Sequence, residues 1–164
     1  MPKLKHYDDT GAARFVTFSC HKEYPLLKDD SAKELLISEI KSARKKYNFK
    51  VIGYAIMPNH VHLVLIPPEG MKLGPVIGEI KSMMARKYFA RNTGSIITER
   101  IFWKRRCYDH NCRSLKAVVE KIEYCHKNPI KHGLVDSLEK YKWTSYGFYQ
   151  EGTNTPLDID EFEP

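Results

Sequence analysis

The sequence predicts an α+β fold, in which a ferredoxin-like βαββαβ antiparallel sheet is followed by an additional C-terminal helix. Three observations favour it. Segments rich in β-branched and aromatic residues alternate with amphipathic helical segments. The short turn Met57-Pro58-Asn59 joins two of the strands as a hairpin. A further amphipathic segment follows Ser114. Because a βαββαβ sheet packs two helices on one face, we expect this additional helix to cover the other.

The elements can be placed in order along the chain. We expect strands at 14–20, 50–56 and 60–66 and extended segments at 101–103 and around Tyr108, with helices at 30–47, 75–91 and 115–128. Pro75 suits the first turn of the second helix. Ser114 is a suitable N-cap for the third, and Pro129 should end it, because the residue before a proline disfavours helical geometry.

Length and charge indicate one domain with an unusual C-terminal end. The 164 residues suit a single domain, which we place at residues 1–150, followed by an acidic tail at 151–164. The tail holds five of the 20 acidic residues and no basic one, so residues 1–150 carry all 27 Lys and Arg against 15 acids. An excess of 12 positive charges favours a polyanionic partner, most often nucleic acid. The tail either lies over a basic groove, where it would compete with DNA, or is disordered.

Targeting features are absent from the sequence as printed. No apolar run is long enough to span a membrane, and Met1-Pro2-Lys3-Leu4-Lys5-His6 lacks the apolar region of a secretory signal. The four cysteines form no CxxC pair and no clear disulfide framework. We therefore expect a reducing, cytoplasmic setting without membrane contact.

Two histidines stand in the most apolar strand. Successive side chains of a strand point to opposite faces, so His60 and His62 share a face with Val64 and Ile66. Burying two neighbouring imidazoles is costly unless each has a partner. A shared metal ion is one solution, and hydrogen bonds to backbone or water are the other.

The helix after Ser114 carries a second group of polar candidates. Leu115, Val118, Val119, Ile122 and Cys125 fall in one apolar arc. Tyr124 lies opposite that arc, with Asn128 one turn later beside it. A carboxamide oxygen is a hard ligand that fits Mg²⁺ or Mn²⁺ better than a closed zinc site. Tyr124 could equally be an ordinary exposed tyrosine and Asn128 a helix-terminal residue.

Taken together, these motifs resemble a known family. His60-Val61-His62 after Met-Pro-Asn resembles the HUH motif (His, hydrophobic, His) of the single-tyrosine transposases of bacterial insertion sequences. The ordered set of further matches resembles the REP-associated branch: Trp103 with Tyr108-Asp109-His110, Tyr124 with Asn128-Pro129, His132-Gly133-Leu134-Val135, and Trp143-Thr144-Ser145-Tyr146.

The resemblance implies a metal-dependent endonuclease and strand transferase that acts on single-stranded DNA at imperfect hairpins. His60, His62 and Asn128 would hold Mg²⁺ or Mn²⁺, and Tyr124 would form a covalent 5′-phosphotyrosine. The enzyme would act at the bacterial nucleoid, as a monomer or a homodimer. Lys121 could assist the phenol. A basic, aromatic patch is a candidate DNA contact, comprising Lys104, Arg105 and Arg106 flanked by Trp103 and Tyr108, and Lys121 is a further candidate. The same stretch could instead be a solvated loop with Trp103 in the core.

Two other functions are compatible with parts of the sequence. A non-catalytic nucleic-acid-binding module on a ferredoxin-like sheet would need aromatic residues on an open sheet face. A structural zinc site could use Cys107, His110 and Cys112, although their spacing is irregular and a fourth ligand is missing.

Overall fold

The computed structural model, which describes residues 13–93 and 99–162, contains a four-stranded antiparallel sheet. The strands are β1 (Ala13–Cys20), β2 (Lys50–Ile56), β3 (His60–Ile66) and β4 (Trp103–Cys112). Their spatial order is β2-β3-β1-β4. The helices are α2 (Asp30–Tyr47), α3 (Leu73–Arg91), α4 (Leu115–Lys131) and α5 (Tyr146–Glu151), with 3-10 turns η1 (His21–Glu23) and η2 (Leu138–Lys140). The predicted fold class is confirmed.

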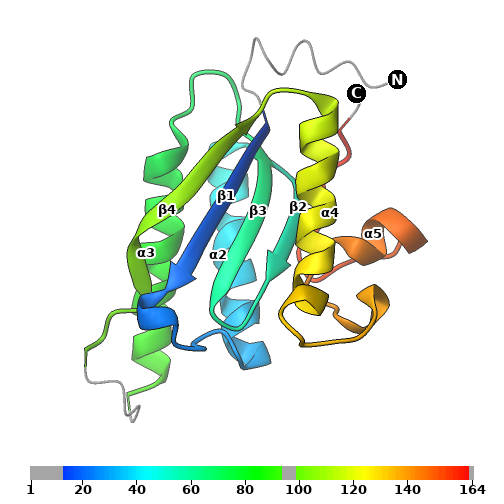
Figure 1. Cartoon of the computed structure of the whole chain (residues 1–164). Helices are drawn as coiled ribbons and strands as arrows, with labels where there is room; N and C mark the ends of the chain where they lie inside the picture. The colour runs from blue at the N-terminus through cyan, green and yellow to red at the C-terminus, as the bar shows by residue number, and fades with distance from the viewer. Residues whose placement is uncertain (1–12, 94–98, 163–164) are drawn as a thin grey trace.

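Helices cover the two faces of the sheet unequally. Helices α2 and α3 lie on one face, and α4 lies on the other, over β2 and β3 (Figure 1). The larger core lies between the sheet and α2 and α3, whereas a smaller core lies beneath α4. Within the described residues, no helix combines the length and the apolar character needed to cross a bilayer.

Strand parity places the histidines as the pattern predicts. In β3, Val61, Leu63 and Leu65 belong to the larger core, and Val64 and Ile66 belong to the core beneath α4. His60 and His62 share the parity of Val64 and Ile66 and therefore face α4. Both faces of β3 are covered, one by α2 and α3 and the other by α4.

Helix α4 begins as expected but ends later. The Ser114 hydroxyl accepts a hydrogen bond from the Ala117 amide at 3.1 Å, which confirms the N-cap. The prediction that Pro129 ends the helix is wrong, because α4 continues to Lys131. Proline removes only its own amide bond, and the next turn still closes from the His132 amide to the Asn128 carbonyl at 3.0 Å. Asn128 is thereby held inside a helical turn.

The basic stretch 104–106 lies in a continuous strand rather than in a loop between two extended segments. It forms part of β4, which pairs with β1 across a register shift between Phe18 and Cys20. Trp103 at the start of β4 is 7% exposed, packs against Phe18 and Phe102, and donates its indole N–H to the Lys81 carbonyl at 3.1 Å. The interpretation of Trp103 as a DNA-stacking residue is therefore wrong, because its ring is buried in the core between the sheet and the helices α2 and α3.

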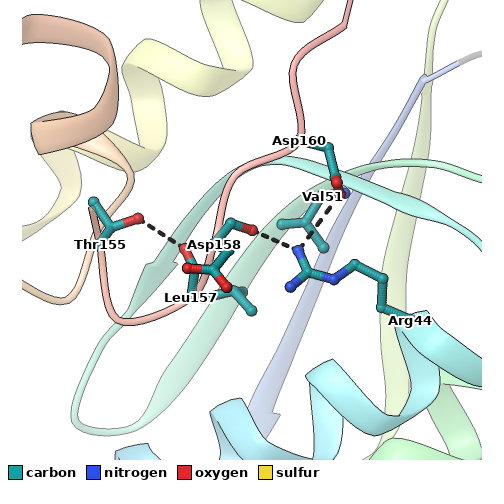
Figure 2. Close-up of polar contacts among 6 residues, drawn as sticks. All are labelled: Arg44, Val51, Thr155, Leu157, Asp158 and Asp160. Atoms are coloured by element: carbon teal, nitrogen blue, oxygen red, sulfur yellow. Dashed lines mark hydrogen bonds and ion pairs between the residues drawn. The ribbon is translucent and has the colours of Figure 1, made fainter. Parts of the chain in front are cut away.

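The acidic segment after Gln150 packs along β2, the edge of the sheet opposite β4. Leu157 is fully buried in the larger core, and its amide donates a hydrogen bond to the Tyr54 hydroxyl at 3.2 Å. Figure 2 shows Asp160 beside Val51 and Arg44. The Val51 amide donates to the Asp160 carboxylate, and the Asp160 amide donates to the Val51 carbonyl, each at 2.8 Å. Residues 1–12, which include the N-terminal hexapeptide, and Glu163 lie outside the described residues.

Residues 143–145 also pair with the outer edge of β2. The Ile56 amide donates to the Trp143 carbonyl at 2.9 Å, and the Ser145 amide donates to the Tyr54 carbonyl at 3.1 Å. The Ser145 hydroxyl accepts from the Tyr54 amide at 3.1 Å and contacts the buried His126 ring at 2.8 Å. The segment after α4 is thus fixed to the sheet through backbone bonds.

Candidate metal and tyrosine site

The predicted site residues converge between β3 and α4. The rings of His60 and His62 lie 4.8 Å apart, and the ring of Tyr124 lies 5.2 Å from that of His62. Asn128 Oδ1 lies 2.9 Å from His60 Nε2. The strand and the helix therefore bring together all four residues that the sequence singled out, although 68 positions separate His60 from Asn128.

Both histidines have one nitrogen occupied by a protein partner. The Nδ1 atom of His62 lies 2.7 Å from the hydroxyl of Thr17, and the Nδ1 atom of His60 lies 2.7 Å from Oδ1 of Asn59. In each case Nδ1–H can donate to the neighbouring oxygen, and this leaves the Nε2 lone pair free. Such contacts set the tautomer and orientation of metal-binding histidines.

The remaining polar atoms suit a cation. His62 is 4% exposed, and its Nε2 atom is buried without a hydrogen-bond partner; Asn128 is 1% exposed. Asn59 and Asn128 both present a carbonyl oxygen to His60, but a neutral imidazole donates only one hydrogen bond. A cation held by both His60 Nε2 and Asn128 Oδ1, which lie 2.9 Å apart, would resolve this conflict.

Electrostatics favour the neutral, metal-binding form of both histidines. Burial lowers the pKa of His60, and burial together with the neighbouring His60 lowers the pKa of His62 to about 3. Both rings are therefore uncharged at neutral pH. Metal binding at this pH would not require either imidazole to lose a proton first.

Cations surround the tyrosine. Tyr124 is 36% exposed, so its ring is reachable from solvent. The Nζ atoms of Lys121 and Lys131 lie 5.9 and 5.3 Å from the centre of that ring. Lys121 also lies over Phe15, whose ring stacks on His62 at 5.4 Å. These positive charges lie where they would attract a phosphate group towards Tyr124.

The structure locates the other predicted residues away from this cluster. Lys104, Arg105 and Arg106 are exposed on β4, and Lys104 forms an ion pair with Glu23 at 3.2 Å. The three-residue zinc site is not formed: no group of three or more His, Cys, Asp or Glu within the described residues could hold a metal. Cys107 and His110 pair with residues of opposite parity on β1, so they lie on opposite faces.

Sequence reasoning missed several residues of the site. Thr17 and Phe15 come from β1, whose register opposite β3 places Thr17 directly across from His62. His132, just after α4, has its ring 5.2 Å from that of His60. For His132 and Lys131, a signal existed in the sequence, because both lie within one or two turns of Asn128. For Thr17, no local signal existed.

Comparisons with known proteins point in the same direction as this geometry. The sequence profile of the family described as "Transposase IS200 like" matches residues 12–127. The chain is 28% identical over 121 residues to a candidate REP-associated tyrosine transposase of Haemophilus influenzae, covering 67% of this chain and 68% of that protein. It is 22% identical over 147 residues to the REP-associated tyrosine transposase of Escherichia coli K12, covering 89% and 83%.

Solved structures share the fold. A REP-associated tyrosine transposase bound to a REP hairpin superposes with a TM-score of 0.71 at 21% identity, covering 99% of this chain and 95% of that one. A candidate transposase from Deinococcus radiodurans R1 superposes with a TM-score of 0.53 at 16% identity, covering 76% and 95%.

Proposed function

Because the chain belongs to the IS200-like transposase family, we propose that it cleaves and rejoins single-stranded DNA through a covalent 5′-phosphotyrosine on Tyr124. In this proposal His60, His62 and Asn128 hold Mg²⁺ or Mn²⁺. The observation that carries the proposal is the convergence of the tyrosine ring, 5.2 Å from His62, with two neutral imidazoles and a carboxamide. A non-catalytic binding module gives no reason for this convergence.

The donor set fits a divalent metal ion. His62 Nε2 is buried and has no hydrogen-bond partner. Asn128 Oδ1 and His60 Nε2, which can both act as acceptors, lie next to each other. When bound, the metal would polarise the scissile phosphate and offset charge that develops on its oxygens. Thr17 and Asn59 would orient the two histidines towards it.

The proposed reaction balances without an external energy source. The Tyr124 oxygen attacks the phosphorus, a phosphorus–oxygen bond forms, and the bond to the 3′ oxygen breaks. The phenol loses its proton to solvent, which reaches the half-exposed ring, and the departing 3′ oxygen takes up a proton. Lys121 and Lys131 stabilise the attacking phenolate. An incoming 3′-hydroxyl reverses these steps and joins a new strand, because the phosphotyrosine retains the bond energy.

Hairpin DNA is the substrate that we propose. The neighbour with the highest TM-score named above was solved with a REP hairpin, and the basic excess of residues 1–150 suits a nucleic acid. We place this activity in the bacterial cytoplasm, at the nucleoid. Both a monomer and a homodimer are compatible with the site, which one chain supplies in full. We also propose that residues 1–150 contain the complete catalytic machinery, while the acidic segment that follows packs on β2 and supplies no site residue.

Trapping the covalent intermediate tests the proposal. A pool of labelled hairpin oligonucleotides with single-stranded flanks is incubated with the protein and Mn²⁺, then separated on a denaturing gel. We expect a shifted protein–DNA adduct, which EDTA prevents and mass spectrometry maps to Tyr124. Tyr124→Phe should abolish the adduct and retain DNA binding, whereas the matched control Tyr24→Phe, at another exposed tyrosine, should retain both. An adduct that persists in Tyr124→Phe would overturn the assignment.

A further inference from the structure

Two aromatic side chains stand side by side on the exposed part of β4. The rings of Tyr108 and His110 are 6.2 Å apart between centres and only 10° from parallel. Tyr108 is 54% exposed, and His110 is also exposed. In Figure 1, α4 lies over β2 and β3, and no helix of the described residues crosses the same face of β4. Neither ring is therefore needed to fill a core.

The spacing of the two rings matches one nucleic-acid base. Alternate residues of a strand stand about 6.6–6.8 Å apart on one face. Bases stack at about 3.4 Å, so a base between two parallel rings needs about twice that distance. The observed 6.2 Å separates the ring centres, so the gap between the ring planes is at most 6.2 Å, and the exposed Tyr108 ring must rotate to admit a base. The pair is therefore a slot that opens to one base thickness by a side-chain rotation.

The slot is continuous with the tyrosine site. Tyr108 contacts Phe15 edge to face at 6.3 Å, and Phe15 contacts Tyr124 in the same way at 5.9 Å. Lys121 Nζ lies 4.7 Å from the centre of the Phe15 ring. The Phe15 ring therefore separates the slot from the proposed nucleophile, and a cation lies over that ring.

Charge on β4 also suits a nucleic acid. Asp109 is the acidic residue between the two rings, but its side chain points to the other face and pairs with Arg14, whose Nε donates at 2.9 Å. Arg105 and Arg106 precede the slot on the same strand and are exposed. The aromatic face is consequently free of an uncompensated negative charge that would repel a phosphate backbone.

We propose that Tyr108 and His110 clamp one unpaired base of the single-stranded DNA beside the scissile phosphate. This inference rests on the proposed function, and it names the part of the substrate that β4 contacts. Clamping a base would hold the strand in position while its neighbouring phosphate meets Tyr124. Stacking between rings tolerates every base, so the slot would position the strand without reading its sequence.

Binding of an oligothymidylate of about 12 nucleotides, a length typical of single-strand sites, tests the slot by fluorescence anisotropy. All proteins carry Tyr124→Phe so that no cleavage occurs. We expect Tyr108→Ala to weaken binding about fivefold to a hundredfold, the range for loss of one stacked base. Tyr108→Phe should restore it. His110→Ala should also weaken binding, and the double variant should lose little more than the larger single change, because both rings hold one base.

Controls separate stacking from charge and from folding. Tyr24→Ala removes a comparably exposed ring elsewhere and should leave affinity unchanged. Tyr108→Ala should not alter the salt dependence of binding, because the ring neutralises no phosphate. A changed salt dependence, or wild-type affinity in Tyr108→Ala, would overturn the slot. If the Tyr124 adduct still forms in the latter case, the proposed function stands without the slot; if the protein binds no single strand and forms no adduct, both fail.

Discussion

Replacing Thr17 by valine removes a single hydrogen bond next to the proposed metal ligand. The Thr17 hydroxyl lies 2.7 Å from His62 Nδ1, and no other hydrogen-bond partner of the His62 ring is present within the described residues. Valine keeps the volume and the β-branched shape, so β1 and its register should be retained. The variant therefore tests whether the tautomer and orientation of His62 depend on this contact.

The expected effect on metal affinity is large relative to that on folding. Without Thr17, the imidazole has no partner that fixes the proton on Nδ1, and a buried N–H without an acceptor costs about 1–3 kcal/mol. Loss of such supporting contacts typically weakens metal binding by about 10- to 100-fold, which corresponds to about 1.4–2.7 kcal/mol. The unfolding free energy of the metal-free protein should change by about 1 kcal/mol or less, because burial of the added valine methyl group offsets part of the free energy lost with the hydrogen bond.

Calorimetric titration with MnCl₂ at neutral pH measures this effect. Thr17→Ser retains the hydroxyl and should bind Mn²⁺ nearly as the wild type does, whereas Thr17→Val should bind more weakly by the stated factor. Nitrogen-15 NMR of the imidazole should show the Nδ1–H tautomer of His62 in the wild type and in Thr17→Ser. Wild-type Mn²⁺ affinity in Thr17→Val would refute the reasoning, and so would an equal loss in both variants.

Three further outcomes follow from the structure. Burial lowers the pKa of His62 to about 3 and of His126 to about 4, below the roughly 6.5 of an unfolded histidine. Between about pH 7 and about pH 4.5 the unfolded chain therefore binds more protons than the folded one, and the unfolding free energy of the metal-free protein should fall by roughly 5 kcal/mol, about half from each histidine. Urea denaturation measures it, and a flat profile would contradict the burial of both rings. Leu157→Ala should cost about 2–5 kcal/mol and lower the Tm, whereas Asn154→Ala, at an exposed position, should leave the Tm unchanged; equal melting of both variants would place the acidic segment outside the core. Lys121→Gln should reduce the slope of log DNA affinity against log salt concentration by the amount expected for about one phosphate contact. An unaltered slope would show that Lys121 does not contact a DNA phosphate.

Much of the fold and of the site could be predicted from local patterns. Alternation along residues 60–66 indicated which side chains face α4, and helical spacing placed Tyr124 and Asn128 on neighbouring positions of one helix. Each of these inferences needs only the period of a single element. Helical spacing also placed Val119 in the apolar arc, but this residue is exposed, because α4 is covered on a narrower stripe than the arc.

Features that depend on long-range register could not be predicted. Thr17 meets His62 only because β1 pairs with β3 in one particular register, 45 residues apart in the chain. Trp103 precedes three basic residues and so suggested a surface patch, but the pairing of β4 with β1 directs its ring into the core. The position of Leu157 likewise depends on a return of the chain to β2, for which an acidic composition gives no signal.

The segments that bond to the outer edge of β2 affect how two molecules of this protein can associate. An edge strand normally displays amide and carbonyl groups that can recruit a strand from a second molecule. Here Trp143, Ser145 and Asp160 bond to the outward backbone groups of Ile56, Tyr54 and Val51, and the Tyr149 hydroxyl donates to the Ile52 carbonyl. The last residues of the chain thus act as an irregular fifth strand. A strand of a second molecule therefore cannot pair with β2. A protein truncated before Trp143 would expose the unpaired backbone groups of β2 and should aggregate.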